Sequence, residues 1–336
     1  LPARSEMCIR DRAKDEQKPQ LMVGEVLKNK QFEELNIEEY QDKTRAFLKI
    51  QDGCNRFCAY CLIPYTRGTT CSKDPQKVLD EIKNLSEHGF KEIILSGIHT
   101  ASYGVDLDGN VTLITLLEEI EKLDGIERVR IGSIEPSFFT DEVIEKMKKM
   151  KKLCPQFHLS LQSGCDATLK RMNRRYTAKE YEDAVNRIRE NLKDASITTD
   201  VIVGFPGETD EEFNETYEYL KRIKLTKTHI FKFSPRKGTK ASDMPNQIDG
   251  NVKDKRSKAL IELNAKNEGD FSKSLVGREL DVLVEQEVSN KPGVFEGYTR
   301  NYVKVEIPNG SRDMIGKIIL CKIMASDAEY VVGKII

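Results

Sequence analysis

Three cysteines stand close together in one short segment, in the order Cys54, Cys58 and Cys61. Their Cys-x3-Cys-x2-Cys spacing puts three thiolates on a single loop, which is one ligand fewer than a closed tetrahedral metal site requires. Thiolates are the usual ligands of iron–sulfur clusters, and a cubane cluster held at three corners leaves one iron open to a small molecule. The spacing therefore predicts a reactive cluster, with these three cysteines as its ligands.

Zinc is the alternative occupant of the same thiols. A structural zinc site takes four ligands, usually in two separated pairs, and here the fourth would have to be Cys71, His88 or His99. None of these residues stands at a recognised zinc spacing. Of the other cysteines, two lie in apolar runs that indicate buried core thiols and three have no assigned role: Cys154 and Cys321, then Cys8, Cys71 and Cys165.

The composition limits the class of protein. The chain has 336 residues, of which 38% are hydrophobic and 32% charged, as expected of a soluble globular protein with more than one domain. No apolar run approaches the ~20 residues that span a bilayer, so we expect no membrane partner. The formal net charge of -1 excludes a global positive field, and any nucleic-acid surface must be local. Eight cysteines without an export signal indicate a cytoplasmic protein.

The residues that surround the cysteines must be positioned by a regular fold. From residue 46 onward, short β-rich runs alternate with segments whose apolar residues recur every three or four positions, which predicts parallel strands joined by helices. Pro75 and Thr177 suit the first position and the N-cap of two helices. We therefore predict an α/β fold, a partial (β/α)6 barrel of the TIM type. The predicted strands are 46–50, 92–95, 129–134, 157–161, 197–203 and 229–233; the predicted helices are 75–88, 113–123, 141–152, 178–192, 208–223 and a closing helix at 252–271.

A second domain is predicted from residue 273 to residue 336, where the apolar period changes to two. Short strands at 280–284, 302–307, 318–323 and 330–336 are separated by glycines, which is typical of a small antiparallel β-barrel of the OB-like kind that binds oligonucleotides. This segment holds nine basic and nine acidic residues. Because it is not basic, a role in packing or domain docking is the alternative to RNA binding.

Polar or glycine-rich segments follow the predicted strands one after another. In a parallel barrel the carboxyl ends of the strands meet at one rim, where catalytic residues gather, so we expect one shared cavity. Each residue also has a structural alternative. Gly97 would permit a tight turn, Glu135 would cap a helix, and His99 and His158 would be core histidines because no partner carboxylate stands at a triad or metal spacing.

At this point the residues resemble a known family. The cysteine triplet, with Tyr60 before its third cysteine, is similar to the radical S-adenosylmethionine (SAM) superfamily, and the segments 51–54 and 63–68 resemble its methylthiotransferase branch. Segments 95–99, 158–166, 172–177 and 233–239 resemble the subgroup that methylthiolates N6-threonylcarbamoyladenosine at tRNA position 37. The Gln-Asn-Val-Asn stretch typical of the isopentenyladenosine subgroup is absent. The resemblance covers residues 21–336, and residues 273–336 correspond to the family's TRAM domain.

The resemblance implies cofactors and a reaction. In the family, a [4Fe-4S] cluster chelates SAM at its open iron and, when reduced, passes one electron to it. The bond between sulfur and C5′ then breaks to give methionine and a 5′-deoxyadenosyl radical, which removes hydrogen from adenine C2. Sulfur comes from a second [4Fe-4S] cluster and the methyl group from a second SAM. The implied partner is the anticodon loop of tRNA at position 37, while the electron donor and the sulfur donor are not implied. Matching positions assign the SAM contacts to Tyr60, Gly97, Glu135, Gln162 and Asp200.

The resemblance also implies domain boundaries. Residues 1–20 resemble a translated cloning or adapter remnant and are expected to be a non-native leader, residues 21–45 a remnant of the N-terminal domain, residues 46–272 the radical SAM domain and residues 273–336 the TRAM domain. The ligands of the second cluster belong to the family's N-terminal domain and are not found here, so we expect the activity of this chain to be incomplete. The alternatives are a methylthiotransferase acting on tRNA isopentenyladenosine or on a ribosomal protein, and a non-catalytic, zinc-containing RNA-binding protein.

Overall fold

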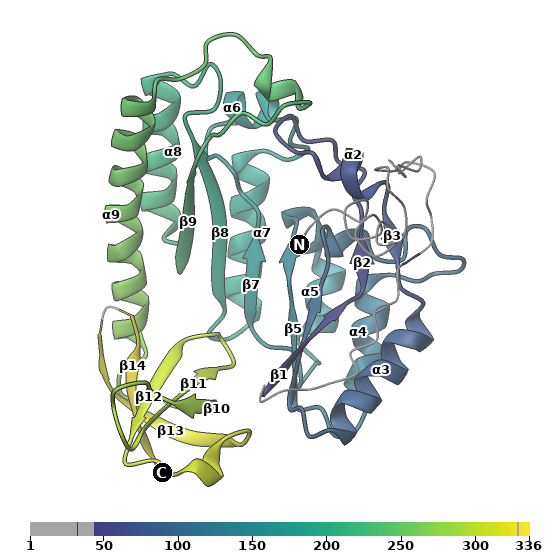
Figure 1. The fold of residues 1–336 in the computed structure, drawn as a ribbon, viewed down its shortest axis with the longest axis vertical. Coiled ribbons are helices and arrows are strands. Elements are labelled where there is room, and N and C mark those ends of the chain that lie inside the picture. Colours follow the sequence, from purple (N-terminus) through teal and green to yellow (C-terminus); the bar gives the residue numbers. More distant parts are fainter. Residues whose placement is uncertain (1–31, 33–43, 328) are drawn as a thin grey trace, which may run out of the picture.

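The computed structural model describes residue 32, residues 44–327 and residues 329–336. The expected leader, Cys8 and nearly all of the expected remnant at 21–45 lie outside the described residues. The described part forms a large open barrel of parallel strands and a small closed barrel beneath it (Figure 1). None of its helices is both long and apolar enough to cross a membrane.

The parallel strands of the open barrel form two neighbouring sheets, in the orders β1-β4-β5 and β6-β7-β8-β9. The prediction of one unbroken third strand was wrong, because Gly132 separates β5 from β6. A Cβ atom on Gly132 would lie 3.1 Å from the carbonyl oxygen of Leu95, so the chain bends where a glycine allows close approach. The strands are β1 Arg45–Lys49, β4 Glu92–Ser96, β5 Arg128–Ile131, β6 Ser133–Ile134, β7 Gln156–Leu159, β8 Ser196–Val203 and β9 Lys227–Lys232.

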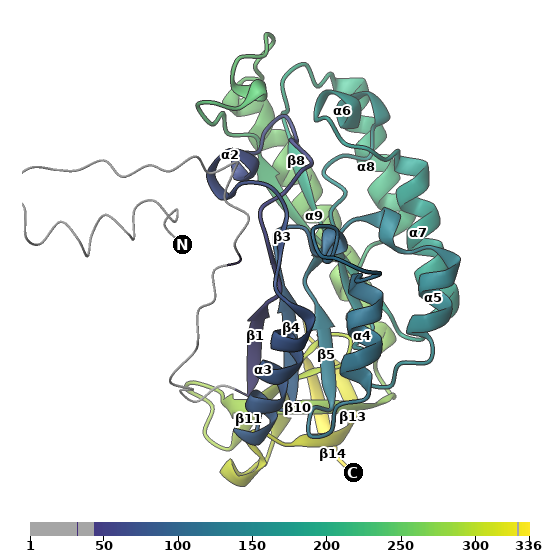
Figure 2. The ribbon, with the colours of Figure 1, turned by 90° about the vertical axis from the view of Figure 1, so that its right-hand side faces the viewer.

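Helices cover the outer face of these sheets (Figure 2). The two predicted cap signals are confirmed: Pro75 occupies the first turn of its helix, and the Thr177 side chain accepts from the backbone N–H of Glu180 in a capping box. Apolar stripes on the helices pack on the buried side of the strands and complete the main core. The helices are α2 Ile63–Arg67, α3 Pro75–Glu87, α4 Leu113–Glu121, α5 Asp141–Met147, α6 Asp166–Arg171, α7 Ala178–Asn191, α8 Asp210–Ile223 and α9 Gly250–Ser274.

The inner face of the open barrel is left partly exposed. Along β8, residues 197, 199, 201 and 203 are buried, whereas the alternate residues between them are only partly buried. Phe47 on β1 and Phe231 on β9 are 58% and 52% exposed on the two edge strands of the opening. The fold therefore keeps an accessible inner surface of polar and aromatic side chains.

The C-terminal domain is a closed barrel in the order β10-β11-β12-β14-β13. The prediction of a wholly antiparallel barrel was wrong in one pair, because β12 and β14 run parallel. The predicted strand list also missed β11, whose Gly297 interrupts the apolar alternation; a Cβ atom there would lie 2.2 Å from the carbonyl oxygen of Leu283. The strands are β10 Glu279–Glu287, β11 Val294–Thr299, β12 Lys304–Pro308, β13 Ile318–Ser326 and β14 Val331–Ile335.

Arginine side chains tie the small barrel to the amino-terminal ends of the parallel strands. Arg128, which is fully buried, donates to the carbonyl oxygens of Tyr298 at 3.0 Å and Asp281 at 2.8 Å. Arg130 donates to the carbonyl oxygen of Arg300 at 3.0 Å, and its guanidinium lies 4.6 Å from the ring centroid of Tyr302. These buried bonds hold the small barrel as a fixed floor beneath the inner face.

Candidate active site

The cysteine loop follows β1 through the two-residue strand β2, Gln51–Asp52, and ends at α2. The backbone N–H of Cys54 donates to Gly68 at 3.0 Å, and that of Cys61 donates to Cys58 at 3.0 Å. Gly53 has a φ of 68°, and a Cβ atom there would lie 1.9 Å from the carbonyl oxygen of Thr69. Only glycine fits this approach, so the loop is closed back on its own end beside the carboxyl end of β1.

The three predicted ligands are free, partly exposed thiols on this one loop. Sγ of Cys54 accepts the backbone N–H of Arg56 at 3.4 Å, and Sγ of Cys58 accepts Nη1 of Arg174 at 3.2 Å. Burial raises the pKa of the Cys54 and Cys61 thiols, so their thiolates need a nearby positive charge. Three thiols on one loop, two of which accept N–H donors, fit the donor set of a cluster held at three corners.

The three residues considered as a fourth zinc ligand make other contacts in the structure. Within the described residues, no three His, Cys, Asp or Glu side chains, the three cysteines of the loop included, converge on one metal-ion position. Cys71 is buried in the short strand β3, Cys71–Ser72, opposite Asp52. Nδ1 of His88 lies 2.8 Å from the carbonyl oxygen of Asn84, and His99 is engaged with Ser102 and Glu135.

Glu135 is the centre of a buried charged cluster at the same rim. Its Oε2 lies 2.6 Å from Nη2 of Arg56 and 3.1 Å from Nε2 of His99, and its Oε1 lies 3.5 Å from Nη2 of Arg174. Burial alone would raise the pKa of Glu135, but the bond to His99 and the charges of Arg174 and Arg56 outweigh it and hold the pKa below its ordinary value. Glu135 occupies the N-cap position of a short 3-10 turn, as the structural alternative expected, but its side chain makes no capping hydrogen bond and is directed to the charged cluster instead.

Gly97 and Gln51 place His99 against this cluster. A Cβ atom on Gly97 would lie 2.9 Å from Oε1 of Gln51 and 3.1 Å from its carbonyl oxygen. Oε1 of Gln51 accepts the backbone N–H of His99 at 2.8 Å, and Nε2 of Gln51 donates to the carbonyl oxygen of Gly53 at 2.8 Å. Gln51 thus links the cysteine loop to His99, and the absence of a side chain at Gly97 leaves room for it.

Of the other assigned positions, Tyr60 lies in the cysteine loop itself, and Gln162 and Asp200 lie after β7 and on β8. Tyr60 packs edge-on against Phe205 with ring centroids 6.4 Å apart. Gln162 has a φ of 72°, and its backbone N–H donates to the carbonyl oxygen of Asp200 at 2.8 Å. The side chain of Asp200 lies 3.3 Å from Nε2 of His158. Gln162 is thus hydrogen-bonded to Asp200, and Glu135 is linked to the cysteine loop through two arginines. Among the described residues, no direct hydrogen bond connects the Gln162–Asp200 pair with the Glu135 cluster.

Two interpretations of histidines are corrected by these distances. His99 and His158 were both interpreted as core histidines because no carboxylate stands at a triad or metal spacing. His99 is buried as expected and His158 is half-buried, but they face the carboxylates of Glu135 and Asp200. His158 and Asp200 lie on the paired strands β7 and β8, whereas the other pair follows β4 and β6, which belong to different sheets, so neither sequence separation has a fixed spacing. Sequence reasoning also gave no role to Arg56 or Arg174; the signal for Arg56 was its position between two of the cysteines.

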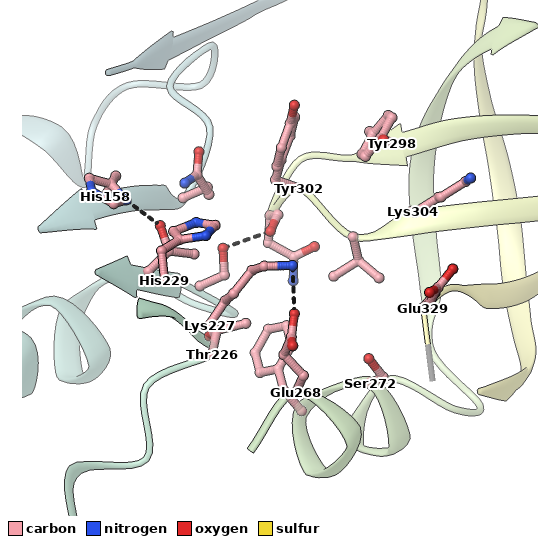
Figure 3. A pocket seen from close by; sticks show the side chains of 16 residues that line it. His158, Thr226, Lys227, His229, Glu268, Ser272, Tyr298, Tyr302, Lys304 and Glu329 are labelled. Atoms are coloured by element: carbon pink, nitrogen blue, oxygen red, sulfur yellow. Dashed lines mark hydrogen bonds and ion pairs between the residues drawn. The ribbon is translucent and has the colours of Figure 1, made fainter. Parts of the chain in front are cut away.

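A cavity of about 670 Å³ lies at the other end of the strands, between the inner face and the small barrel (Figure 3). His158 and His229 line one wall with ring centroids 6.0 Å apart, and burial lowers the pKa of His229. Tyr302 and Lys304 line the facing wall, and Lys227 pairs with Glu268 of α9 at 2.8 Å. The cavity is rich in hydrogen-bonding groups and its charges are largely paired.

An open parallel barrel with a three-thiol loop after its first strand, closed below by a small barrel, defines the class of cluster-dependent SAM enzymes. The Radical SAM superfamily profile matches residues 48–220, and the TRAM domain profile matches residues 273–336. The structure of the radical SAM methyltransferase TsrM from Kitasatospora setae aligns with a TM-score of 0.50 at 17% identity, over 59% of this chain and 38% of that chain. That likeness concerns the fold alone.

Curated relatives narrow the class. The threonylcarbamoyladenosine tRNA methylthiotransferase MtaB of Bacillus subtilis is 40% identical over 97% of this chain and 72% of its own length. The protein of the same name from Aquifex aeolicus is 43% identical over 80% of this chain and 65% of its own. A tRNA-2-methylthio-N(6)-dimethylallyladenosine synthase from Thermoanaerobacter is 38% identical over 91% and 64%. The chain thus spans about two thirds of the length of these relatives, and it belongs to the radical SAM methylthiotransferase family.

Proposed function

We propose that this chain carries the SAM-cleaving part of a tRNA methylthiotransferase, with C2 of N6-threonylcarbamoyladenosine 37 as the target. The observation that supports it most is the junction of the cysteine loop with the Glu135 cluster through Arg56 and Arg174. This junction places a cluster-binding loop beside a charged site suited to the amino and carboxylate groups of SAM.

Each residue at the rim has a defined task in this proposal. Cys54, Cys58 and Cys61 hold the cluster, which when bound supplies the electron that cleaves SAM. Glu135 accepts a hydrogen bond from the polar edge of SAM, and Gly97, by leaving room for Gln51, keeps the neighbouring rim in the shape that receives the methionine end of SAM. The low pKa of Glu135 keeps its carboxylate ionised for that contact.

The inner face and the small barrel supply the RNA side. A base of a tRNA loop has to be splayed out for chemistry at C2, and splayed bases stack on aromatic side chains. Phe47 and Phe231 present exposed rings on the two edge strands of the opening, and the TRAM domain forms the floor below them. We place position 37 of the anticodon loop at this opening.

The threonylcarbamoyl substrate is favoured by the relatives that carry that name, at 40% and 43% identity. Dimethylallyladenosine is the second candidate, because relatives named for it are 38% identical. Equilibrium binding to anticodon stem-loops that carry threonylcarbamoyladenosine, dimethylallyladenosine or unmodified adenosine at position 37 separates the two. Tightest binding to the dimethylallyl stem-loop would reverse the assignment.

The reaction class is tested by anaerobic iron–sulfur reconstitution followed by reduction with SAM. We expect a brown protein with the broad visible absorption of a cluster, and 5′-deoxyadenosine as the product of SAM cleavage. A colourless protein that retains zinc would support the non-catalytic RNA-binding alternative. Nucleoside mass spectrometry after incubation with tRNA, SAM, sulfide and reductant measures whether this chain alone forms the methylthio product.

A further inference from the structure

The turn that follows α6, residues 172–174, holds the cysteine loop by direct contacts at the same rim of the barrel. The backbone N–H of Ala59 donates to the carbonyl oxygen of Met172 at 2.9 Å, and Nδ2 of Asn173 donates to that of Phe57 at 2.9 Å. Nη1 of Arg174 donates to Sγ of Cys58 at 3.2 Å. Three consecutive residues therefore each contact a different position of the loop, 116 residues away in the case of Asn173 and Arg174.

Backbone strain marks both sides of this contact. Phe57 has a φ of 50° and Asn173 a φ of 59°, which places two non-glycine residues in the left-handed region. Such conformations persist where the surrounding structure enforces them, and they gather at functional sites. The Asn173 amide bonds the carbonyl oxygen of Phe57, so each strained residue fixes the other.

Arg174 is oriented by a third partner. Its Nε donates to the hydroxyl of Tyr176 at 2.9 Å, and its guanidinium lies 4.7 Å from the centroid of that ring. The Tyr176 hydroxyl in turn bonds the carbonyl oxygen of Leu161 at 3.0 Å. With Nε fixed, one Nη atom points at Cys58 and the other at Glu135, 3.5 Å away. The arginine side chain is 7% exposed, and a lysine lacks this fork of donors.

We propose that Arg174 is a positioning residue that sets the Cys58 sulfur and the Glu135 carboxylate relative to each other and makes the bound cluster easier to reduce. The inference rests on the proposed function, because it takes Cys58 as a cluster ligand. Reduction adds negative charge that is shared by the sulfurs, and an N–H donor from a cation stabilises that charge, so hydrogen bonds to sulfur raise the potential. The same side chain then couples the cluster to the acid that contacts SAM.

The test is the midpoint potential of the reconstituted cluster, measured by redox titration with electron paramagnetic resonance. For Arg174→Met we expect about a tenfold lower ratio of reduced to oxidised cluster at the wild-type midpoint, which corresponds to about 59 mV for one electron. Arg175→Gln is the matched control, because Arg175 is the exposed neighbour of Arg174. Equal midpoints for the Arg174→Met and Arg175→Gln proteins would overturn the inference.

Two further variants keep the test decisive if Arg174→Met fails to fold. Arg174→Lys keeps the positive charge but lacks the several N–H donors of a guanidinium, and we expect its midpoint potential to fall by less than that of Arg174→Met. A midpoint equal to that of the wild type would contradict the positioning role. Asn173→Gly keeps the left-handed turn without the amide, and we expect faster loss of iron to a chelator at an unchanged midpoint. Iron loss at the wild-type rate would show that the Asn173 amide does not hold the cysteine loop in place. A wild-type chain that assembles no cluster would instead refute the proposed function and this inference with it.

Discussion

Oε2 of Glu135 lies 3.1 Å from Nε2 of His99, although the two residues follow different strands of the barrel. Both lie at the rim that carries the cysteine loop, and Arg56 reaches the same carboxylate oxygen from within that loop at 2.6 Å. Two guanidinium groups and one carboxylate leave this rim with a net positive charge beside the thiols. These positive groups oppose the effect of burial, which raises the pKa of the Cys54 and Cys61 thiols, and they suit the carboxylate of an amino-acid ligand.

The cysteine assignment predicts an asymmetry between two thiol substitutions. Cys58→Ala should abolish cluster assembly, because it removes one of three ligands and the acceptor of Arg174. Cys154→Ala is the control: Cys154 is fully buried, so its truncation should cost ~1–3 kcal/mol of stability while iron binding is retained. Iron per chain after reconstitution is the measurement, and wild-type iron in the Cys58 variant would refute the assignment.

The fold was predictable because its signals are local. The strand and helix periods and the caps at Pro75 and Thr177 each depend on a few neighbouring residues. The break at Gly132 and the parallel pairing of β12 with β14 depend on contacts between distant strands. No residue period records such contacts, so sequence reasoning could not reach them.

The residues of the candidate site also fall into those that the sequence predicted and those that only the structure shows. The cysteine ligands were proposed from their spacing, since all three lie within eight positions. The pairing of His99 with Glu135, and the approach of Arg174 to Cys58, arise only when separate strands and a turn meet at the rim. A carboxylate that comes from another strand has no characteristic sequence separation from its histidine, so the paired histidines resembled core residues.

The close contact between Gly97 and Gln51 predicts that a side chain at position 97 lowers both the stability of the chain and its retention of the cluster. Gly97→Ala should cost ~1–3 kcal/mol of stability, because the added methyl group must displace buried Gln51. Since Gln51 also bonds Gly53 and His99, cluster retention should fall as well. Gly269→Ala in α9 is the control; nothing lies within 4 Å of its Cβ, and helix propensity should stabilise it by up to ~1 kcal/mol. Denaturation midpoints and iron content are the readouts, and a Gly97 variant with both values intact would contradict the account.

The domain junction predicts that one arginine is critical for stability. Arg128→Met should destabilise the chain by ~3–5 kcal/mol, because it leaves two carbonyl oxygens of the small barrel without their donor and removes one of the two buried arginines beside Glu92, the other being Arg130. Lys122→Ala removes an exposed pair with Glu119 and should change stability by less than ~1 kcal/mol. Chemical denaturation of both variants tests this. Equal effects would mean that the small barrel is not held by Arg128.

The first turn of α8 predicts a pH-dependent contribution to stability. Hydrogen bonds from Arg171, at 2.8 Å from Oε1, lower the pKa of Glu212 below its ordinary value. A carboxyl group with a lowered folded-state pKa stabilises the fold above its unfolded pKa of about 4.3, and this contribution disappears as the pH falls through the folded-state pKa.

Glu212→Gln should therefore lower the denaturation midpoint at neutral pH, and its difference from the wild type should shrink as the pH falls below about 4.3. The control is Glu218→Gln, which removes an exposed pair with Lys221 and should have a small effect at every pH. Urea denaturation across this pH range measures both differences. A Glu212→Gln difference that stays constant as the medium becomes acidic would show that the charge of Glu212 is not what stabilises this turn.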